Sequence, residues 1–142
     1  MKAKEFITEE VDDVLYHVTK TTSVPSILKK GINLLRTTNW VTAGSKERYG
    51  AGEIYAFDHP TDAQRWAGKM DWEFFQELGS GKISIVEFTK GQTKWEQDNN
   101  DPMSQFGKKG NWLKSNDGIP ANQIIKAYPF TQEMARALVN QL

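Results

Sequence analysis

At 142 residues, with 38% hydrophobic and 11% aromatic residues, the chain is predicted to form one domain with a substantial core. Its 18 basic residues balance 18 acidic ones, which argues against a general attraction for nucleic acid or for an anionic membrane. The absence of cysteine excludes disulfides and thiolate chemistry, two histidines are too few for a histidine-rich metal site, and the apolar runs are too short to span a membrane. We therefore expect a monomeric cytoplasmic protein, with no metal and no membrane partner.

The first half of the chain predicts two units in which a strand is followed directly by a helix. Residues 3–12 have weak helical spacing and predict a short leading helix or arm. Residues 14–18 are β-branched and aromatic and predict a strand, and residues 22–31 predict a helix that begins with capping hydroxyls and ends in Lys-Lys-Gly. Residues 53–57 predict the second strand, and residues 58–75, which open with Asp and Pro, predict the second helix.

The second half alternates strands with polar sequence. Residues 82–88 predict a strand, residues 121–128 predict a last strand that ends before Pro129, and Thr131 is placed to cap a C-terminal helix. Two long polar stretches, 33–52 and 89–120, predict loops, and loops of this length in a compact domain are usually functional. The elements together predict an α+β domain, with a twisted, mostly antiparallel pair of sheets around a cleft and short flanking helices.

The first strand–helix unit carries a recognisable motif. The strand leads into His17-Val18-Thr19, and the helix ends in Ile27-Leu28-Lys29-Lys30-Gly31. In this pattern the chain resembles the ADP-ribosyltransferase superfamily, whose first core strand ends in a His followed two residues later by Ser or Thr. Many members have Gly between the two, because the backbone there approaches the nicotinamide carboxamide. Val18 departs from that pattern, although members resembling the DNA-targeting toxins also carry a branched apolar residue.

The second unit provides a second match to the same superfamily. Tyr55 lies on the second strand, and the helix that follows contains Ala63-Gln64-Arg65-Trp66-Ala67. The resemblance implies that Tyr55 stacks on the nicotinamide ring of NAD, whereas Trp66 is an ordinary core residue. It also implies that the strands of His17 and Tyr55 lie side by side, with both side chains facing one cleft.

The reaction that the resemblance implies is cleavage of the bond between nicotinamide and ribose in NAD. His17 and Thr19 would hold the ribose, with the Val18 backbone against the carboxamide. A carboxylate best stabilises the oxocarbenium-like state, and two positions compete for this third role. Gln123 matches the late-strand Glu of the polymerase and toxin types, and Asp101 matches the loop Asp of the short rifampin ADP-ribosyltransferases. Turn chemistry is an alternative explanation for Asp101.

The long loop between the two motif strands contains Arg48, whose planar guanidinium suits a pyrophosphate. The leading hypothesis is therefore a mono-ADP-ribosyltransferase that uses NAD as substrate and transfers ADP-ribose to a protein, a nucleic acid or a small molecule. One alternative is a catalytically inactive module on the same fold, which binds a nucleotide or another protein. Another alternative is an RNA 2'-phosphotransferase-like enzyme.

Overall fold

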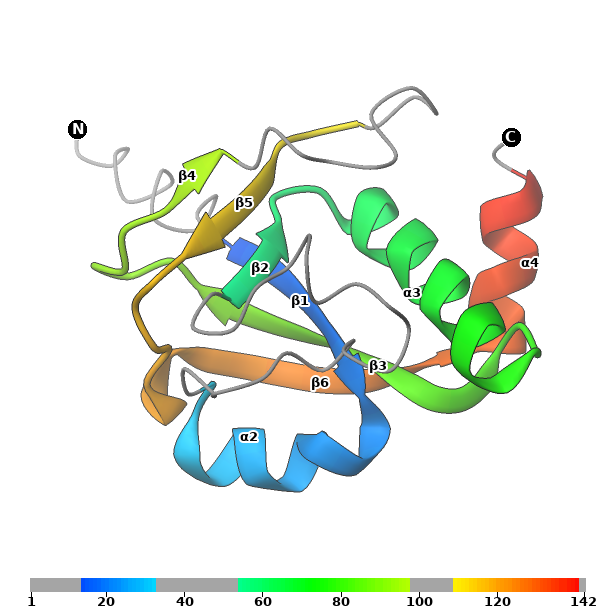
Figure 1. Cartoon of the computed structure of the whole chain (residues 1–142), viewed down its shortest axis with the longest axis horizontal. Helices are drawn as coiled ribbons and strands as arrows, with labels where there is room; N and C mark the ends of the chain where they lie inside the picture. The colour runs from blue at the N-terminus through cyan, green and yellow to red at the C-terminus, as the bar shows by residue number, and fades with distance from the viewer. Residues whose placement is uncertain (1–13, 33–53, 98–108, 141–142) are drawn as a thin grey trace, which may run out of the picture.

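The computed structural model describes residues 14–32, 54–97 and 109–140. Its elements, in chain order, are β1 (Val14–Lys20), the short 3-10 helix η1 (Thr21–Ser23), α2 (Val24–Lys30), β2 (Ile54–Phe57), α3 (Pro60–Phe75), β3 (Ser80–Thr89), β4 (Glu96–Gln97), β5 (Trp112–Ser115), η4 (Ala121–Gln123), β6 (Ile124–Thr131) and α4 (Gln132–Asn140) (Figure 1). The helix predicted at 3–12 and the loop predicted at 33–52 lie outside the described residues.

The strands form one six-stranded sheet in the order β4-β5-β2-β1-β3-β6, and every neighbouring pair is antiparallel. The α+β class is confirmed, because the helices flank an antiparallel sheet instead of alternating with parallel strands. The prediction of a pair of sheets is wrong for the described residues. Continuous pairing across β1, β2 and β3 joins all six strands into one sheet.

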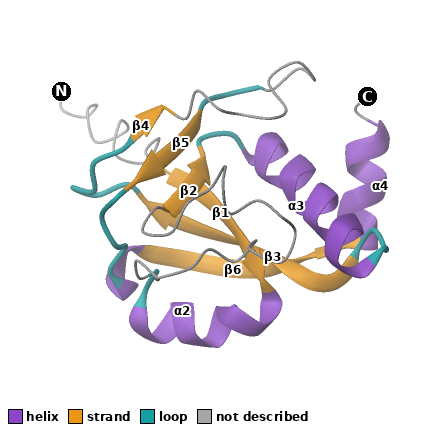
Figure 2. Ribbon diagram, viewed as in Figure 1, coloured by secondary structure: helices purple, strands orange, loops and turns teal. Residues whose placement is uncertain are grey.

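The helices cover both faces of this sheet (Figure 2). One core cluster joins α3 and α4 to one face and includes Val18, Phe57, Trp66 and Phe130. The other cluster lies on the α2 side and includes Leu15, Ile27, Ala56, Val86 and Phe88. Because β3 is covered on both faces, its residues Ile83, Ser84, Ile85 and Val86 are all buried, and the strand does not show strict apolar–polar alternation.

Local sequence signals explain the helix ends. In α2, a proline occupies the first turn, and Gly31 ends the helix with a φ of 82°, a left-handed conformation that favours glycine. A Cβ at Gly31 would lie 2.0 Å from the carbonyl oxygen of Ile119. At α3 the cap is the His59 ring, which accepts from the Thr61 N–H, and at α4 the Met134 N–H donates to the Thr131 hydroxyl as predicted.

The prediction of an uninterrupted loop over 89–120 is wrong, because β4 and β5 lie within it. β5 pairs with all four residues of β2, and Trp112 packs edge-on against Phe57 at 4.7 Å and Trp66 at 5.7 Å between ring centroids. Strands of two and four residues carry too little local periodicity to be recognised, and they are stabilised by pairing with distant segments.

The last strand also differs from its prediction. Residues 121–123 form the 3-10 helix η4, and β6 begins at Ile124 and continues through Pro129 to Thr131. β6 is an edge strand of the sheet, and at an edge proline is tolerated because its missing N–H faces away from the neighbouring strand.

Two carboxylates at the start of α3 hold the segment that leads into β5. Asp62 is almost fully buried and accepts from the backbone N–H groups of Lys109 and Gly110 and from the indole N–H of Trp112. Asp58 accepts from the backbone and side-chain N–H groups of Asn111. These bonds fix β5, and through it β2, against the helix.

We expect Asp62→Ala to lower the free energy of unfolding by about 3 kcal/mol or more, because it leaves three donors without an acceptor. The control is Glu73→Ala on the same helix, which removes only an exposed pair with Lys69 and should cost about 0.5 kcal/mol or less. Urea unfolding measures both variants. Equal losses in the two variants would contradict the role given to Asp62.

Candidate functional site

β1 and β2 separate from one another near His17. Only one Cα pair joins them, Tyr16 with Phe57, whereas β1 and β3 are paired along the whole of β1. Beyond that single pair, the His17 ring bridges the two strands, with 2.7 Å between its Nδ1 atom and the carbonyl oxygen of Tyr55. A side chain therefore occupies a place where an antiparallel ladder would have a backbone hydrogen bond.

This hydrogen bond fixes the tautomer of His17. A carbonyl oxygen can only accept, so Nδ1 carries the proton and donates it. Burial lowers the pKa of His17 below the usual value near 6.5, while the hydrogen bond to Tyr55 raises it to a smaller extent. The imidazole is therefore neutral near pH 7, with the lone pair on Nε2 available as an acceptor. The Nε2 atom has no hydrogen-bond partner among the described residues.

Along a strand, the backbone N–H and C=O groups of successive residues point alternately to the two neighbouring strands, and this gives the direction of these groups around the gap. The Tyr55 carbonyl reaches His17, so it points toward β1, and the groups of Phe57, two residues on, point the same way. Tyr16 is paired with Phe57 and presents its N–H and C=O to β2. Two residues further along β1, the N–H and C=O of Val18 are therefore also directed toward β2, across the gap.

The side chains of His17 and Tyr55 lie on opposite faces of the sheet. His17 is opposite Val86 on β3, which belongs to the cluster on the α2 side, whereas Tyr55 packs against the cluster that includes Val18 and Phe57. The expectation that their strands are neighbours is confirmed. The expectation that both side chains face one cleft is wrong. Tyr16 and Phe57 are partners on one face of the sheet, Tyr55 is two positions from Phe57 and shares that face, and His17 is one position from Tyr16 and lies on the other face. The two residues meet through the Tyr55 carbonyl, at the gap between the strands.

Thr19 is fully buried on the same face as His17, opposite Ser84 of β3. Trp66 is a buried core residue, as predicted. Lys114 of β5, which the sequence did not suggest, is the Cα partner of Tyr55 on the side away from β1. Arg48 and Asp101 lie outside the described residues.

Gln123 is held by a structural contact. Its side-chain N–H group donates to the carbonyl oxygens of Thr89, at 2.8 Å, and Lys90, at 3.3 Å. The amide also packs against Gly91, where a Cβ would lie 2.6 Å from its nitrogen. Gln123 lies in η4, not on a strand as predicted, and it leads into β6, which β3 separates from β1 by about 10 Å. The structure does not bring Gln123 to His17.

Glu87 is a carboxylate on β3, one position from Val86, the partner of His17. It lies opposite Tyr16 and accepts from the Tyr128 hydroxyl at 2.8 Å. Burial raises the pKa of both Tyr16 and Tyr128, and Glu87 raises it further, through its charge at Tyr16 and through its hydrogen bond and charge at Tyr128. Tyr16 and Tyr128 pack against the α3-side cluster, so Glu87 faces away from the side of the sheet that His17 occupies.

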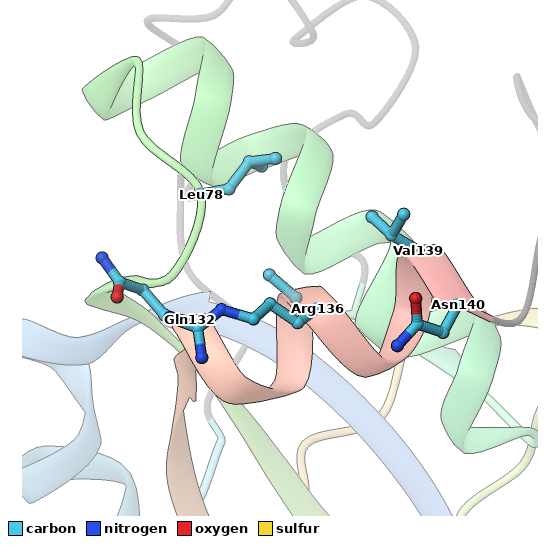
Figure 3. Close-up of a pocket in the computed structure, with 6 residues that line it drawn as sticks. Leu78, Gln132, Arg136, Val139 and Asn140 are labelled. Carbon is cyan, nitrogen blue, oxygen red and sulfur yellow. The ribbon is translucent and has the colours of Figure 1, made fainter.

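Two surface hollows lie apart from His17. One, of about 540 Å³, lies between α4 and the segment after α3, and is lined by Leu78, Gln132, Ala135, Arg136, Val139 and Asn140 (Figure 3). The other, of about 250 Å³, lies at the edge formed by β4 and β5, and includes Trp95, whose buried indole N–H has no acceptor in the described part of the chain. Within residues 14–32, 54–97 and 109–140, no three His, Asp or Glu side chains are grouped to hold a metal ion, and no helix is long and apolar enough to cross a membrane.

No protein-family model matches the chain, and no curated protein is similar to it in sequence. Among solved structures, the one named EcPltA is similar with a TM-score of 0.50 and 13% identity, over 81% of this chain and 74% of that one. Protein CC0527 from Caulobacter crescentus and a double mutant of it give a TM-score of 0.45 and 9% identity, over 89% of this chain and 98% of theirs. At this identity the similarity to EcPltA concerns the fold alone.

The lowered pKa of His17 predicts a pH dependence of stability. As the pH falls, the unfolded chain takes up a proton at its histidine before the folded protein does, so the free energy of unfolding decreases below about pH 6.5. Above that pH the contribution of His17 is fully present. Urea unfolding between about pH 8 and pH 5 should show this slope in the wild type and a smaller slope in His17→Gln. Identical slopes would contradict the burial of a neutral imidazole.

Gln123→Ala should lower the free energy of unfolding by about 1–2 kcal/mol, because the carbonyls of Thr89 and Lys90 lose their donor. It should leave the NMR resonances of the His17 ring unchanged, since Gln123 is distant from it. Gln92→Ala, at an exposed position in the same turn, is the control and should change neither the free energy of unfolding nor the His17 resonances. A shift of the His17 resonances in Gln123→Ala would show that the two side chains are coupled.

Proposed function

We propose that the chain is an NAD-binding domain of the ADP-ribosyltransferase type, which cleaves the bond between nicotinamide and ribose and transfers ADP-ribose to an acceptor. The observation that carries the proposal is the state of His17. It is a buried neutral imidazole, oriented by the Tyr55 carbonyl, with Nε2 left as an acceptor at the gap between two core strands. The state of His17 supports the proposal alongside the motif resemblance, and the fold similarity to EcPltA is compatible with the proposal.

We propose that the ligand binds in the gap between β1 and β2. A ligand placed between two strands contacts residues on both faces of the sheet. The backbone N–H and C=O of Val18 bind the carboxamide, as a further rung of the ladder. The Tyr55 ring packs against the nicotinamide from the α3 side, and His17 Nε2 accepts from a ribose hydroxyl on the other side. Because His17 and Tyr55 lie on opposite faces, the proposal requires a bound ligand to reach both faces of the sheet through the gap.

The proposed reaction breaks the bond between the ribose carbon C1' and the nicotinamide nitrogen. The electron pair of this bond leaves with nicotinamide, which becomes neutral, and the ribose carbon develops positive charge. A nucleophilic atom of the acceptor then forms the new bond to that carbon and loses its proton. When water is the acceptor, the products are nicotinamide, ADP-ribose and a proton. The acceptor is a protein, a nucleic acid or a small molecule.

A second candidate function is an NAD-binding module without catalysis, and one observation favours it. A fixed carboxylate best stabilises the positive ribose, but no described carboxylate is hydrogen-bonded to His17. The side chain of Gln123 is hydrogen-bonded to the carbonyl oxygens of Thr89 and Lys90, and Glu87 faces the side of the sheet opposite His17. Asp101 is the remaining sequence candidate for this role, and it decides between the two functions.

Calorimetry and nicotinamide release test the proposal together. Tyr55→Ala and His17→Ala should each weaken NAD binding by about 1–3 kcal/mol, the range for losing a stacked ring or a buried hydrogen bond. Trp72→Ala, which removes an exposed aromatic ring elsewhere on the surface, is the control and should bind NAD as the wild type does.

The outcome distinguishes the candidates. Release of nicotinamide by the wild type, abolished in Asp101→Asn, would identify an enzyme with Asp101 as its acid. Binding without release would leave the non-catalytic module. Folded Tyr55→Ala and His17→Ala proteins with wild-type affinity for NAD would remove the proposed site altogether.

A further inference from the structure

Two lysines are held over neighbouring aromatic rings where β1 ends and β3 begins. The Lys20 ammonium lies 4.5 Å from the centroid of the Phe74 ring, and the Lys82 ammonium lies 5.1 Å from that of Phe75. The two rings are themselves 6.3 Å apart between centroids, in the last turn of α3. Each ring attracts its ammonium through the negative charge on its face, so the two cations are kept on one small area of surface.

The backbone around both lysines is fixed by hydrogen bonds. The Thr21 hydroxyl donates to the Gly81 carbonyl at 2.7 Å and lies 2.8 Å from the Ser84 hydroxyl, which ties the end of β1 to the start of β3. The Lys82 N–H donates to the Ser80 hydroxyl, and that hydroxyl in turn donates to the buried carboxylate of Asp71. The lysines therefore extend from two hydrogen-bonded strand ends, the end of β1 and the start of β3, and not from a free loop.

No acid in the described part of the chain neutralises either lysine. Among the described residues, Lys20 and Lys82 make no ion pair, whereas Lys69, whose ammonium also lies near an aromatic ring, is paired with Glu73. Two ammonium groups without acidic partners, placed on adjacent rings, are arranged to bind an anion with more than one negative charge.

The position of Lys20 relates this anion site to the gap beside His17. Lys20 is two residues beyond Val18 on β1, and thus points to the same face about 7 Å further along the strand. We propose that Lys20 and Lys82 bind the diphosphate of the dinucleotide whose nicotinamide end lies in the gap. This inference rests on the function proposed above and adds the residues that recognise the charged part of the substrate.

The local charge favours a compact anion over a nucleic-acid strand. Glu73 and Glu77 flank the two rings in the sequence, and both are exposed. They would repel a phosphate backbone that extends past the lysines, whereas a compact diphosphate bound at the two ammonium groups would not have to extend past them. The chain as a whole has no net positive charge to offset that repulsion.

The test compares dissociation constants for NAD and for ADP-ribose in Lys20→Gln/Lys82→Gln, which removes both charges and keeps both side chains polar. We expect both constants to rise by about fivefold to tenfold, because two charge-assisted contacts are lost. Lys20→Arg/Lys82→Arg should restore most of the affinity. Lys69→Gln is the matched control and should bind as the wild type does. Added salt should weaken binding by the wild type more than by the double Gln variant.

The outcomes separate this inference from the proposed function. If the wild type binds NAD and ADP-ribose, and the double Gln variant binds them equally well, the diphosphate site is wrong while the proposed function stands. If the wild type binds neither ligand, the proposed function and this inference fail together. If the double Gln variant loses affinity for a single-stranded oligodeoxythymidine but not for NAD, the lysines form a nucleic-acid surface, and the inference is also wrong.

Discussion

The pairing of β1 with β3 constrains the centre of this protein. β1 is matched to β3 over its full length, and β3 is buried on both faces, so the course of β1 is set by a strand that cannot move. β2 is held mainly by β5, because all four of its residues pair with that strand. β5 is in turn fixed to α3, because Asp58 and Asp62 bind the segment that precedes β5. β1 and β2 are held by different partners and separate after one shared pair, and beyond that pair the His17 ring bridges them through the Tyr55 carbonyl.

This origin of the gap explains the chemical state of His17. An imidazole placed inside a sheet is shielded from water, which disfavours its charged form. Its Nδ1 atom contacts the Tyr55 carbonyl oxygen, which can only accept, and this fixes the proton on Nδ1. A neutral ring in a fixed orientation serves as a hydrogen-bond acceptor and not as a cation, and this is the property that the proposed contact with a ribose hydroxyl requires.

Helix α3 links both proposed parts of the site to the rest of the fold. Its first turn holds the start of β5 through Asp62, and near its end Asp71 accepts from the N–H groups of Gly79 and Ser80 and from the Ser80 hydroxyl. The same last turn provides the rings of Phe74 and Phe75 for the two lysines. One helix therefore positions the strand that diverges from β1 and the cations at the end of β1.

The sequence by itself determined the elements whose signals are local. The β-branched strand around His17, the helix that ends in Gly31, the strand of Tyr55 and the helices begun by Pro60 and capped by Thr131 were all recognisable, because turn residues and apolar periods act over a few residues. Only the tertiary structure decided the short β4 and β5, the structural role of Gln123 and the opposite faces of His17 and Tyr55. Each of these depends on which strands pair and in which register, and pairing between segments far apart in the chain leaves no local pattern to recognise.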